Sequence, residues 1–372
     1  MTWLIGLITF FVLLWAITRF HLAGSDLSRF DAGEDSGPPP TEPSPEHHAA
    51  VEMIRAMQRD APGSLGSKDR LQAMRARFDA MSDGVEFDAT FTPVSAGGVP
   101  AEWVVAPGVD PARRLLYIHG GAYMLGSPKS HRAITAKFSK VAGAAVLAID
   151  YRLMPEHRRR AGIEDCRTAY RWIIEHGPDG PAPVAALFVA GDSAGGNLTL
   201  GTIAWARDAG LRAADAVVAL SPHTDSCMAS PSLRENIATD HMLGPMFAPM
   251  ARVPQAAGLW MSWLTNRIAP SDPAVSPLRG DLAGLPPTLI HASEAEMLLD
   301  DSRRYLNKAR AAGSDVRLRT WHHQLHVWHM FEQTLPEAQE AFAHIEAFID
   351  ECAPDARESD RQDLPPQTHA AG

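Results

Sequence analysis

The sequence predicts an α/β fold: a mainly parallel, twisted sheet with helices on both faces and a helical cap. Three observations predict it. Short apolar runs of the buried-strand type recur along the chain, and segments of helix-forming composition alternate with them. The run at residues 187–190 passes through a glycine–serine–glycine turn into helix-forming residues, and the run at residues 115–118 also breaks into glycines. Strands that are apolar throughout are typical of a parallel sheet that is covered on both faces.

Six runs are expected to form the parallel strands, at residues 115–118, 145–149, 187–190, 216–220, 288–291 and 316–321. The helices expected between them span residues 132–142, 164–176, 198–209 and 300–312. Residues 85–92 and 102–106 are expected to enter the sheet as an antiparallel pair. Residues 230–265 interrupt the alternation, because they are rich in Met, Pro and Trp, and they are interpreted as an inserted segment.

Composition and charge limit the function classes. The 372 residues are 45% hydrophobic, which suits one large domain with additions. The net charge is -10, so no basic field exists to attract a nucleic acid, and none is expected as a partner. The three cysteines, Cys166, Cys227 and Cys352, are widely spaced and form no CxxC pair. They indicate neither a disulfide framework nor a zinc site.

The first 23 residues predict a single membrane anchor. Residues 3–17 are apolar, and counting on through Arg19 to Leu22 reaches the roughly 20 residues that a spanning helix needs. A signal peptide is the main alternative, although the segment lacks a basic start and an Ala-x-Ala-like cleavage site. An amphipathic or buried helix is the third interpretation. Arg19 and Arg29 follow the apolar stretch, which favours a cytoplasmic position for the rest of the chain.

The remaining chain divides by composition. Residues 24–45 are rich in Pro and Gly and are interpreted as a linker between the anchor and the domain. Residues 46–352 form the main domain, and residues 353–372 are expected to be a disordered tail. Residues 46–81 have helical spacing broken at Ala61-Pro62-Gly63. Segments at about 46–82 and 230–268 are expected to form the cap.

The glycine–serine turn predicts a catalytic nucleophile. Gly191-Asp192-Ser193-Ala194-Gly195 has the Gly-x-Ser-x-Gly pattern between a strand and a helix, which is the context of a nucleophile elbow. There Ser193 Oγ would be exposed above the sheet. A turn without chemistry is the alternative, because the bare pattern is common by chance. The upstream loop argues against that alternative, because a serine hydrolase also needs preorganised N–H donors for an oxyanion. The expected donors are Gly120, Gly121 and Ala194.

These motifs resemble the hormone-sensitive-lipase family of α/β-hydrolases, which are serine carboxylesterases and lipases. The resemblance covers roughly residues 51–350. It rests on His119-Gly120-Gly121-Ala122, on Gly191-Asp192-Ser193-Ala194-Gly195-Gly196-Asn197-Leu198, on Tyr151-Arg152-Leu153-Met154-Pro155-Glu156-His157, on Ser221-Pro222-His223-Thr224-Asp225, and on Ser271-Asp272-Pro273-Ala274-Val275-Ser276-Pro277-Leu278. It implies the α/β-hydrolase fold, and it implies that His119 shapes the oxyanion loop.

Two features depart from the family. Ala122 stands where the family has a third oxyanion glycine, but an alanine still carries an N–H. Arg158-Arg159-Arg160 replaces apolar and proline residues, and it is interpreted as a solvated basic turn, near lipid head groups if the anchor spans a membrane.

The resemblance also implies a triad of Ser193 with an acid and a histidine, in that order along the chain. The family's Asp-x-Leu-x-Asp frame matches Glu296-Met297-Leu298-Leu299-Asp300, which puts Glu296 in the acid's place. Glu294 and Asp300 remain alternatives. Asp300 and Asp301 also suit a helix start, because acids there complement the helix dipole.

The base is expected in the loop after the last strand. His326-Val327-Trp328 matches the family's histidine followed by an apolar pair, with His322, His323 and His329 as competitors. Four histidines could also suggest a metal, but no nearby carboxylate motif completes such a site, so no metal or other cofactor is expected.

The sequence therefore predicts a serine carboxylesterase for short- or medium-chain esters or lactones. An amide-cleaving hydrolase and a non-catalytic binding protein on the same fold are the alternatives. An apolar substrate pocket is expected from the cap side chains, although they could equally be core residues: Met242, Met246, Phe247, Met250, Trp260 and Trp263.

Overall fold

The main sheet runs in the order β1-β2-β4-β3-β7-β8-β9-β10 in this computed structural model, which describes residues 2–31, 42–59 and 68–354. All neighbouring pairs from β4 to β10 are parallel, and β2 is antiparallel to both β1 and β4. The predicted, mainly parallel sheet is thus confirmed. Its strands are β1 (Thr90–Ala96), β2 (Val99–Val105), β3 (Asp110–Ile118), β4 (Ala144–Ile149), β7 (Ala186–Asp192), β8 (Ala216–Leu220), β9 (Thr288–Ser293) and β10 (Val316–Trp321).

The antiparallel entry differs from its predicted position. β1 starts at Thr90 instead of residue 85, and β2 starts at Val99. The turn between them is Gly97-Gly98, and both glycines have positive φ angles of 63° and 97°. Glycine adopts that region without the steric cost of a side chain, so this pair sets the hairpin register. A separate two-stranded ribbon joins β5 (His176–Gly177) to β6 (Gly180–Pro181).

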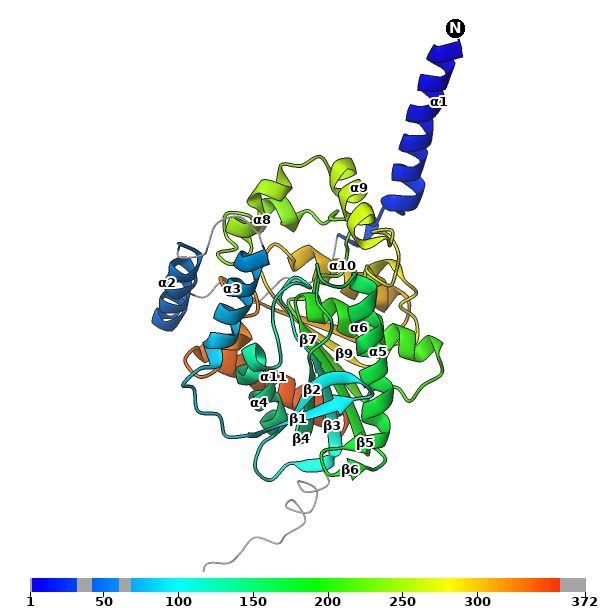
Figure 1. Cartoon of the computed structure of the whole chain (residues 1–372). Helices are drawn as coiled ribbons and strands as arrows, with labels where there is room; N and C mark the ends of the chain where they lie inside the picture. Colours follow the sequence, from blue (N-terminus) through cyan, green and yellow to red (C-terminus); the bar gives the residue numbers. More distant parts are fainter. Residues whose placement is uncertain (1, 32–41, 60–67, 355–372) are drawn as a thin grey trace, which may run out of the picture.

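Helices cover both faces of the sheet (Figure 1). One face packs on α5 (Arg159–Glu175), α6 (Ala194–Asp208) and α10 (Leu299–Ala311), and the other on α4 (Arg132–Val141) and α11 (Pro336–Cys352). Alternate side chains of β3 divide between the two cores: Leu116 and Ile118 enter the first, Leu115 and Tyr117 the second. Both sets are buried, which explains why the strand reads as a continuous apolar run.

Apart from the N-terminal helix, the α-helices described outside this core fall in the two segments expected to form the cap. The first segment supplies α2 (Pro45–Arg59) and α3 (Lys68–Asp79), and the predicted break at residues 61–63 lies outside the described residues. The second is inserted between β8 and β9. It supplies α7 (Ser232–Glu235), α8 (Gly244–Ala251) and α9 (Gln255–Asn266), and Figure 1 shows α8 and α9 above the sheet.

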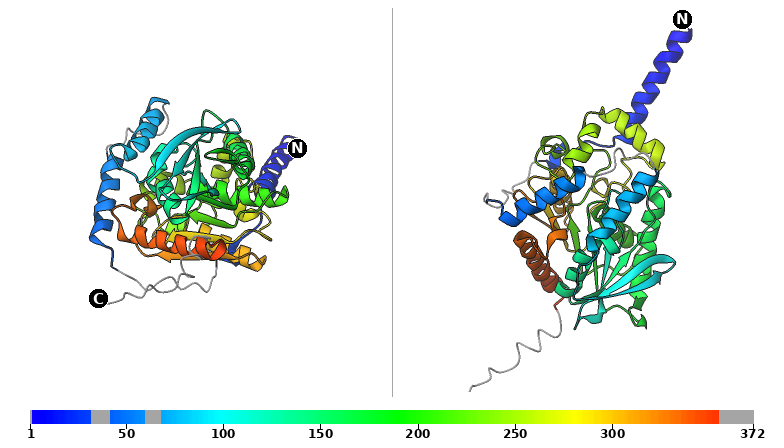
Figure 2. Two further views of the ribbon diagram at one scale, coloured as in Figure 1. Left: turned by 90° about the horizontal axis from the view of Figure 1, so that it is seen from below. Right: turned by 60° about the vertical axis from the view of Figure 1, so that its left-hand side comes forward.

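The N-terminal helix α1 (Thr2–Ala16) projects from the domain and continues as a π-helix over Ile17–Leu22 (Figures 1 and 2). The first part of the predicted linker at residues 24–45 is not a free linker, because the chain up to Asp31 packs on the domain. Leu22 and Leu27 are buried there, and Asp31 pairs with Arg304. Residues 32–41, and residues 355–372 of the predicted tail, lie outside the described residues.

Candidate active site

The Gly191–Gly195 turn has the strained geometry of a nucleophile elbow. Ser193 lies between β7 and α6 with φ 52° and ψ −116°, a conformation that costs an ordinary residue about 1–3 kcal/mol. A Cβ on Gly191 would lie 2.6 Å from the Ile118 carbonyl oxygen, and one on Gly195 would lie 1.9 Å from the same atom. Only glycine therefore fits on either side of the serine, which explains the sequence pattern.

The predicted triad residues meet at this turn. His326 Nε2 lies 2.8 Å from Ser193 Oγ, and His326 Nδ1 lies 2.7 Å from Glu296 Oε2. Glu296 is fully buried, and its other oxygen accepts a hydrogen bond of 2.8 Å from the backbone N–H of Ser293, at the end of β9. A carboxylate that accepts from Nδ1–H leaves Nε2 free to accept the serine proton.

The alternative acids point elsewhere. Glu294 forms an ion pair with Arg303 at 2.7 Å. Asp300 lies in the first turn of α10, and it accepts a hydrogen bond of 2.8 Å from the backbone N–H of Ser232. Neither carboxylate contacts His326 in the structure. The longer Glu side chain therefore reaches the position that the family fills with aspartate.

Glu296 also changes the protonation of the histidine. Burial is the largest influence on the pKa of His326 and favours the neutral form. The hydrogen bond from Nδ1 to Glu296 and the charge of that carboxylate together outweigh burial, so the pKa of His326 lies above its ordinary value. The pair is thus suited to hold a proton taken from Ser193.

The predicted oxyanion donors separate into two groups. Gly120 is a correction, because its N–H donates to Asp192 Oδ1 at 3.0 Å and is committed there. Within the described residues, the N–H groups of Gly121, Ala122 and Ala194 donate to no protein acceptor. Ala122 has φ 53°, a left-handed conformation that costs an L-residue about 1–2 kcal/mol. Ala122 therefore joins Gly121 and Ala194 as a candidate donor.

A buried polar cluster behind the oxyanion loop escaped the sequence analysis. Asp192 accepts hydrogen bonds from Tyr117 Oη at 2.6 Å and from Gly120, and its other oxygen lies 3.4 Å from His131 Nε2. Burial raises the pKa of Asp192, but His131 and the hydroxyl of Tyr117 outweigh burial and lower it. Asp192 is the variable position of the Gly-x-Ser-x-Gly pattern, so the motif gave no signal for it.

His119 shapes the same loop, as the resemblance implies. Its Nδ1 lies 2.8 Å from the Gly120 carbonyl oxygen, and its ring stacks on Tyr151. Burial, with the nearby His131, lowers the pKa of His119 to about 3. The ring is therefore neutral and is not positioned as the base.

The other histidines of the C-terminal loop lie apart from Ser193. His329 is buried beside His291, with 3.1 Å between their ring nitrogens, and burial lowers its pKa to about 3. His322 and His323 contact one another. Among the residues that the structure describes, no group of three or more His, Cys, Asp or Glu could hold a metal ion.

A cavity of about 300 Å³ opens beside Ser193. Ser193 is not among its lining residues, but Ala122 and Tyr123 of the oxyanion loop are, and so is His223. The backbone N–H of His223 donates to the Ser193 carbonyl at 3.2 Å. The wall is mostly apolar and includes Leu233, Phe247, Met250, Leu259, Met261 and Met297.

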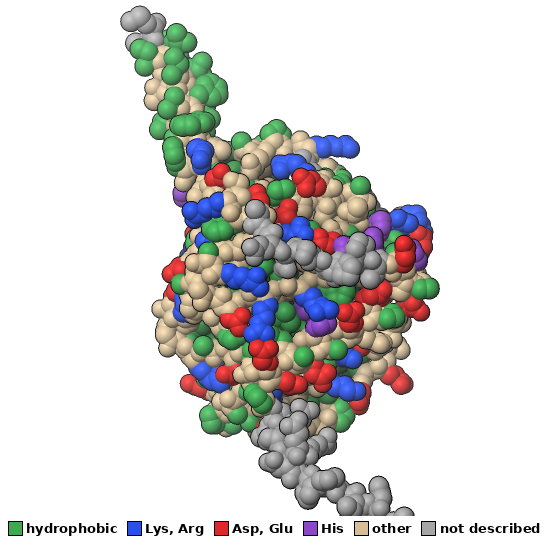
Figure 3. Space-filling model, turned by 180° about the vertical axis from the view of Figure 1, so that it is seen from behind, with side chains coloured by type: hydrophobic (Ala, Val, Ile, Leu, Met, Phe, Trp, Pro, Cys, Tyr) green, Lys and Arg blue, Asp and Glu red, His purple; other side chains and the backbone are tan. Residues whose placement is uncertain are grey.

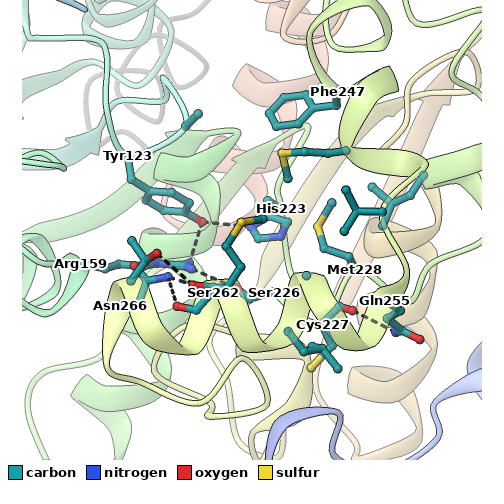
Figure 4. Close-up of a pocket in the computed structure, with 18 of the residues that line it drawn as sticks. Tyr123, Arg159, His223, Ser226, Cys227, Met228, Phe247, Gln255, Ser262 and Asn266 are labelled. Carbon is teal, nitrogen blue, oxygen red and sulfur yellow. Dashed lines mark hydrogen bonds between the residues drawn. The ribbon is translucent and has the colours of Figure 1, made fainter. Parts of the chain in front are cut away.

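Arg159 corrects the predicted solvated turn. Arg158 and Arg160 are exposed, but Arg159 is only 6% exposed and lines the cavity. Its guanidinium donates to Tyr123 Oη at 2.7 Å (Figure 4). It also donates to Asn197 Oδ1 at 2.8 Å. It also donates to Ser226 and to the Val275 carbonyl, so its hydrogen-bond acceptors are neutral oxygens. Tyr123 Oη in turn contacts His223 Nδ1 at 3.0 Å. Burial lowers the pKa of His223 to about 4, and the positive charge of Arg159 contributes to this decrease.

The cap side chains expected to form the pocket do not all do so. Phe247 and Met250 line the cavity, whereas Met246 is exposed. Met242 packs on the cluster around Trp321 and Trp328. The remaining two, Trp260 and Trp263, pack on the chain that follows α1.

Comparisons with known proteins agree with this fold. A family model described as the alpha/beta hydrolase fold matches residues 115–330. An acetyl-hydrolase of Streptomyces hygroscopicus is 38% identical over 256 residues, which cover 69% of this chain and 81% of that protein. A carboxylesterase/phospholipase of Mycobacterium tuberculosis is 34% identical over 275 residues, 71% of this chain and 70% of that protein. The crystal structure of an esterase from the bacterial hormone-sensitive lipase family has a TM-score of 0.72 at 33% identity, and the match covers 84% of this chain and 99% of that one.

Proposed function

Because the chain belongs to the hormone-sensitive-lipase family of α/β-hydrolases, we propose that it is a serine carboxylesterase that works through an acyl-enzyme. One observation carries the proposal: the continuous hydrogen-bonded chain from Ser193 through His326 to Glu296, with distances of 2.8 and 2.7 Å. That is the geometry that activates a serine hydroxyl as a nucleophile.

In the first half-reaction, Ser193 Oγ attacks the ester carbonyl carbon while its proton passes to His326 Nε2. Glu296 stabilises the resulting imidazolium. The tetrahedral intermediate collapses, the bond to the alcohol oxygen breaks, and His326 returns the proton to the leaving alkoxide. In the second half-reaction, water gives a proton to His326 and attacks the acyl-enzyme. The carboxylic acid leaves, and Ser193 regains its proton.

The oxyanion of each intermediate would lie against the N–H groups of Gly121, Ala122 and Ala194. Two of these belong to the loop that Asp192 fixes through Gly120, and the third begins α6. Donors that are already in place need no reorganisation when the charge develops, and removing one such donor costs an enzyme roughly 10²–10³-fold in kcat. The mechanism needs neither a metal nor an organic cofactor.

The cavity supports short or medium acyl chains, or lactones, as substrates. Its volume is at the small end of ligand pockets, which span about 300–1,000 Å³. Its apolar wall suits the hydrocarbon part of an ester. Arg159, Tyr123 and His223 add a polar end beside the nucleophile.

The test compares the full-length chain with Ser193→Ala on a panel of aryl esters, lactones and anilides. We expect ester turnover to fall by roughly 10³-fold or more, since a triad acts as one unit. A variant that retains a tenth of the turnover would remove Ser193 from the mechanism. Faster cleavage of anilides than of esters would indicate an amide hydrolase, and tight substrate binding without turnover in the unmodified chain would indicate a binding protein.

We also propose that α1 and the residues after it anchor the chain in a membrane. Trp3–Leu22 is long and apolar enough to span a bilayer by length and composition. Ten apolar side chains of α1 are more than half exposed, which is costly in water but suits lipid. Carbonate extraction of host membranes should leave the chain in the pellet with its first residue intact. A shortened soluble form would instead indicate a cleaved signal peptide. The cytoplasmic location of the rest of the chain remains a prediction from Arg19 and Arg29.

A further inference from the structure

The chain that follows α1 is attached to the cap. Leu22 is fully buried against Cys227 and Leu259, and Trp260 Nε1 donates to Thr18 Oγ1 at 2.8 Å. Ser271 Oγ donates to the His21 carbonyl at 2.6 Å. These contacts join the end of the apolar helix directly to α9 and to the residues that follow it.

The next residues are attached to the body of the domain. Arg279 donates to the Ser25 carbonyl at 3.0 Å, and a Cβ on Gly24 would lie 2.7 Å from that guanidinium. Asn307 donates to the Phe30 carbonyl at 2.8 Å, and Arg304 pairs with Asp31. A segment held at this many points transmits the orientation of the apolar helix to the whole domain.

The cap surface beside this attachment is apolar and has no acidic residue. Residues 241–271 contain no Asp or Glu, although the whole chain has 44. In α8 and α9 the four exposed large apolar side chains, each 41–53% exposed, are Met246, Met250, Met261 and Leu264. Arg252 and Arg267, at the ends of these two helices, are also exposed. We call residues 244–267 the cap face.

The rim of the cavity lies on the cap face. Met250 and Met261 line the cavity and are at the same time about half exposed, so they lie where it meets the surface. Figure 1 shows α8 and α9 at the end of the molecule from which α1 projects, and Figure 3 shows hydrophobic side chains covering that projecting helix.

We propose that the cap face rests on the bilayer that α1 enters, and that the cavity opens onto it, so that the substrates are esters dissolved in the membrane. The inference rests on the proposed esterase activity and anchor. Apolar side chains at the rim give a lipid-phase ester a path to the nucleophile without crossing water. The exposed Arg19, Arg252 and Arg267 suit anionic head groups, which attract cations that lie near the membrane surface.

The arrangement of the fold favours a bilayer as the partner of the cap face. The apolar helix projects beside the face and is fixed to it, so entry of that helix into a membrane brings the face to the membrane surface. A second copy of the chain would have to cover the face while leaving α1 in lipid. The absence of acids between residues 241 and 271 matches a surface of anionic head groups.

The test uses the full-length chain in vesicles of phosphatidylcholine and phosphatidylglycerol. Two esters share one fluorescent alcohol: methylumbelliferyl acetate, which is water-soluble, and methylumbelliferyl octanoate, a medium-chain ester that partitions into the bilayer. Met246→Glu and Leu264→Glu place a charge on the cap face at positions outside the cavity wall. Met53→Glu is the matched control, because Met53 is 45% exposed on α2, on the other side of the molecule from α1 (Figure 2).

We expect each cap-face variant to lower turnover of the octanoate ester by about tenfold relative to the acetate ester, the effect of roughly 1.4 kcal/mol. Met53→Glu should leave that ratio unchanged. An unchanged ratio in both cap-face variants, or an equal loss on both esters, would overturn the inference while leaving the esterase in place. A detergent-solubilised dimer that both variants convert to a monomer would assign the face to a second copy instead. No turnover of either ester by the unmodified chain would reject the proposed function, and the membrane inference with it.

Discussion

At the scale of single residues, the site depends on which charges are paired and which are not. One oxygen of the Glu296 carboxylate accepts a hydrogen bond from a backbone N–H, and the other contacts His326 Nδ1. The orientation of the carboxylate is therefore fixed at both oxygens. Asp192 holds Gly120 in a similar way. Arg159 differs, because it is a buried cation whose acceptors are neutral. Two predictions follow from these arrangements.

The first concerns Glu296 and pH. The base works only while His326 is neutral, so activity should be lost as the pH falls through the pKa of His326, which lies above 6.5. Glu296→Gln removes the carboxylate that raises this pKa. The acid limb of the pH–activity profile should then move to lower pH, while maximal kcat falls by roughly 10²–10⁴-fold. Glu294→Gln is the control and should change neither, and an acid limb that stays in place in Glu296→Gln would contradict the assignment.

The second concerns Arg159 and the charge of the substrate. A guanidinium that lines an apolar cavity without a carboxylate partner should favour an acyl group that carries its own carboxylate, such as an aryl hemisuccinate. Arg159→Met should raise KM for the hemisuccinate by about tenfold relative to the neutral butyrate ester. Arg160→Met is the matched control, because Arg160 is exposed. A KM ratio that moves equally in both variants would argue for a general effect of charge.

At the scale of elements, the position of Ser193 depends on how closely β7 and α6 approach the end of β3. The Ile118 carbonyl oxygen lies so near Gly191 and Gly195 that neither tolerates a side chain. Further along α6, Gly201 has nothing within 4 Å of a built Cβ. One helix therefore contains both a glycine required by packing and one that packing does not require.

This contrast gives the third prediction. Gly195→Ala should force α6 away from β3 and abolish ester turnover. It should also lower the free energy of unfolding by roughly 1–3 kcal/mol or more, which is the usual cost of overpacking a core. Gly201→Ala should keep full turnover and raise the free energy of unfolding by about 1 kcal/mol, since alanine is the better helix former. Urea unfolding and aryl-ester kinetics measure both. Equal turnover and equal free energies of unfolding in the two variants would contradict the close approach of α6 to the Ile118 carbonyl.

At the scale of the whole molecule, the residues that follow α1 connect that helix rigidly to the cap segments and to the body of the domain. The chain from Ile17 to Asp31 contacts α9, Arg279 and α10, so the domain does not hang from a free linker. The boundary of a soluble domain therefore lies after Ala16, at the end of α1, and not after Asp31.

The fourth prediction concerns that boundary. Removing residues 1–16 should leave the free energy of unfolding unchanged. Removing residues 1–31 also takes away Leu22, whose burial contributes about 1.5–3 kcal/mol, and Asp31, the partner of the buried Arg304. We therefore expect the longer truncation to be less stable by roughly 2–4 kcal/mol in urea unfolding. Equal stability of the two truncations would show that the docked segment adds nothing.

The sequence by itself determined the parallel sheet and the serine turn, and its resemblance to the family predicted the order of the triad. These depend on local patterns: apolar runs of strand length, glycines around a serine, and a histidine followed by an apolar pair. The resemblance to the family's Asp-x-Leu-x-Asp frame also favoured Glu296 over Glu294 and Asp300.

Only the tertiary structure decided the features that depend on contacts between distant segments. Gly120 and Asp192 are 72 positions apart, and their hydrogen bond removes the Gly120 N–H from the expected donors. Arg159 is indistinguishable from Arg158 and Arg160 by composition, yet packing buries it alone among the three. Leu22 meets Leu259 across the cap. Local propensity has no information about such partners, because their interaction energy exists only once the fold has brought them together.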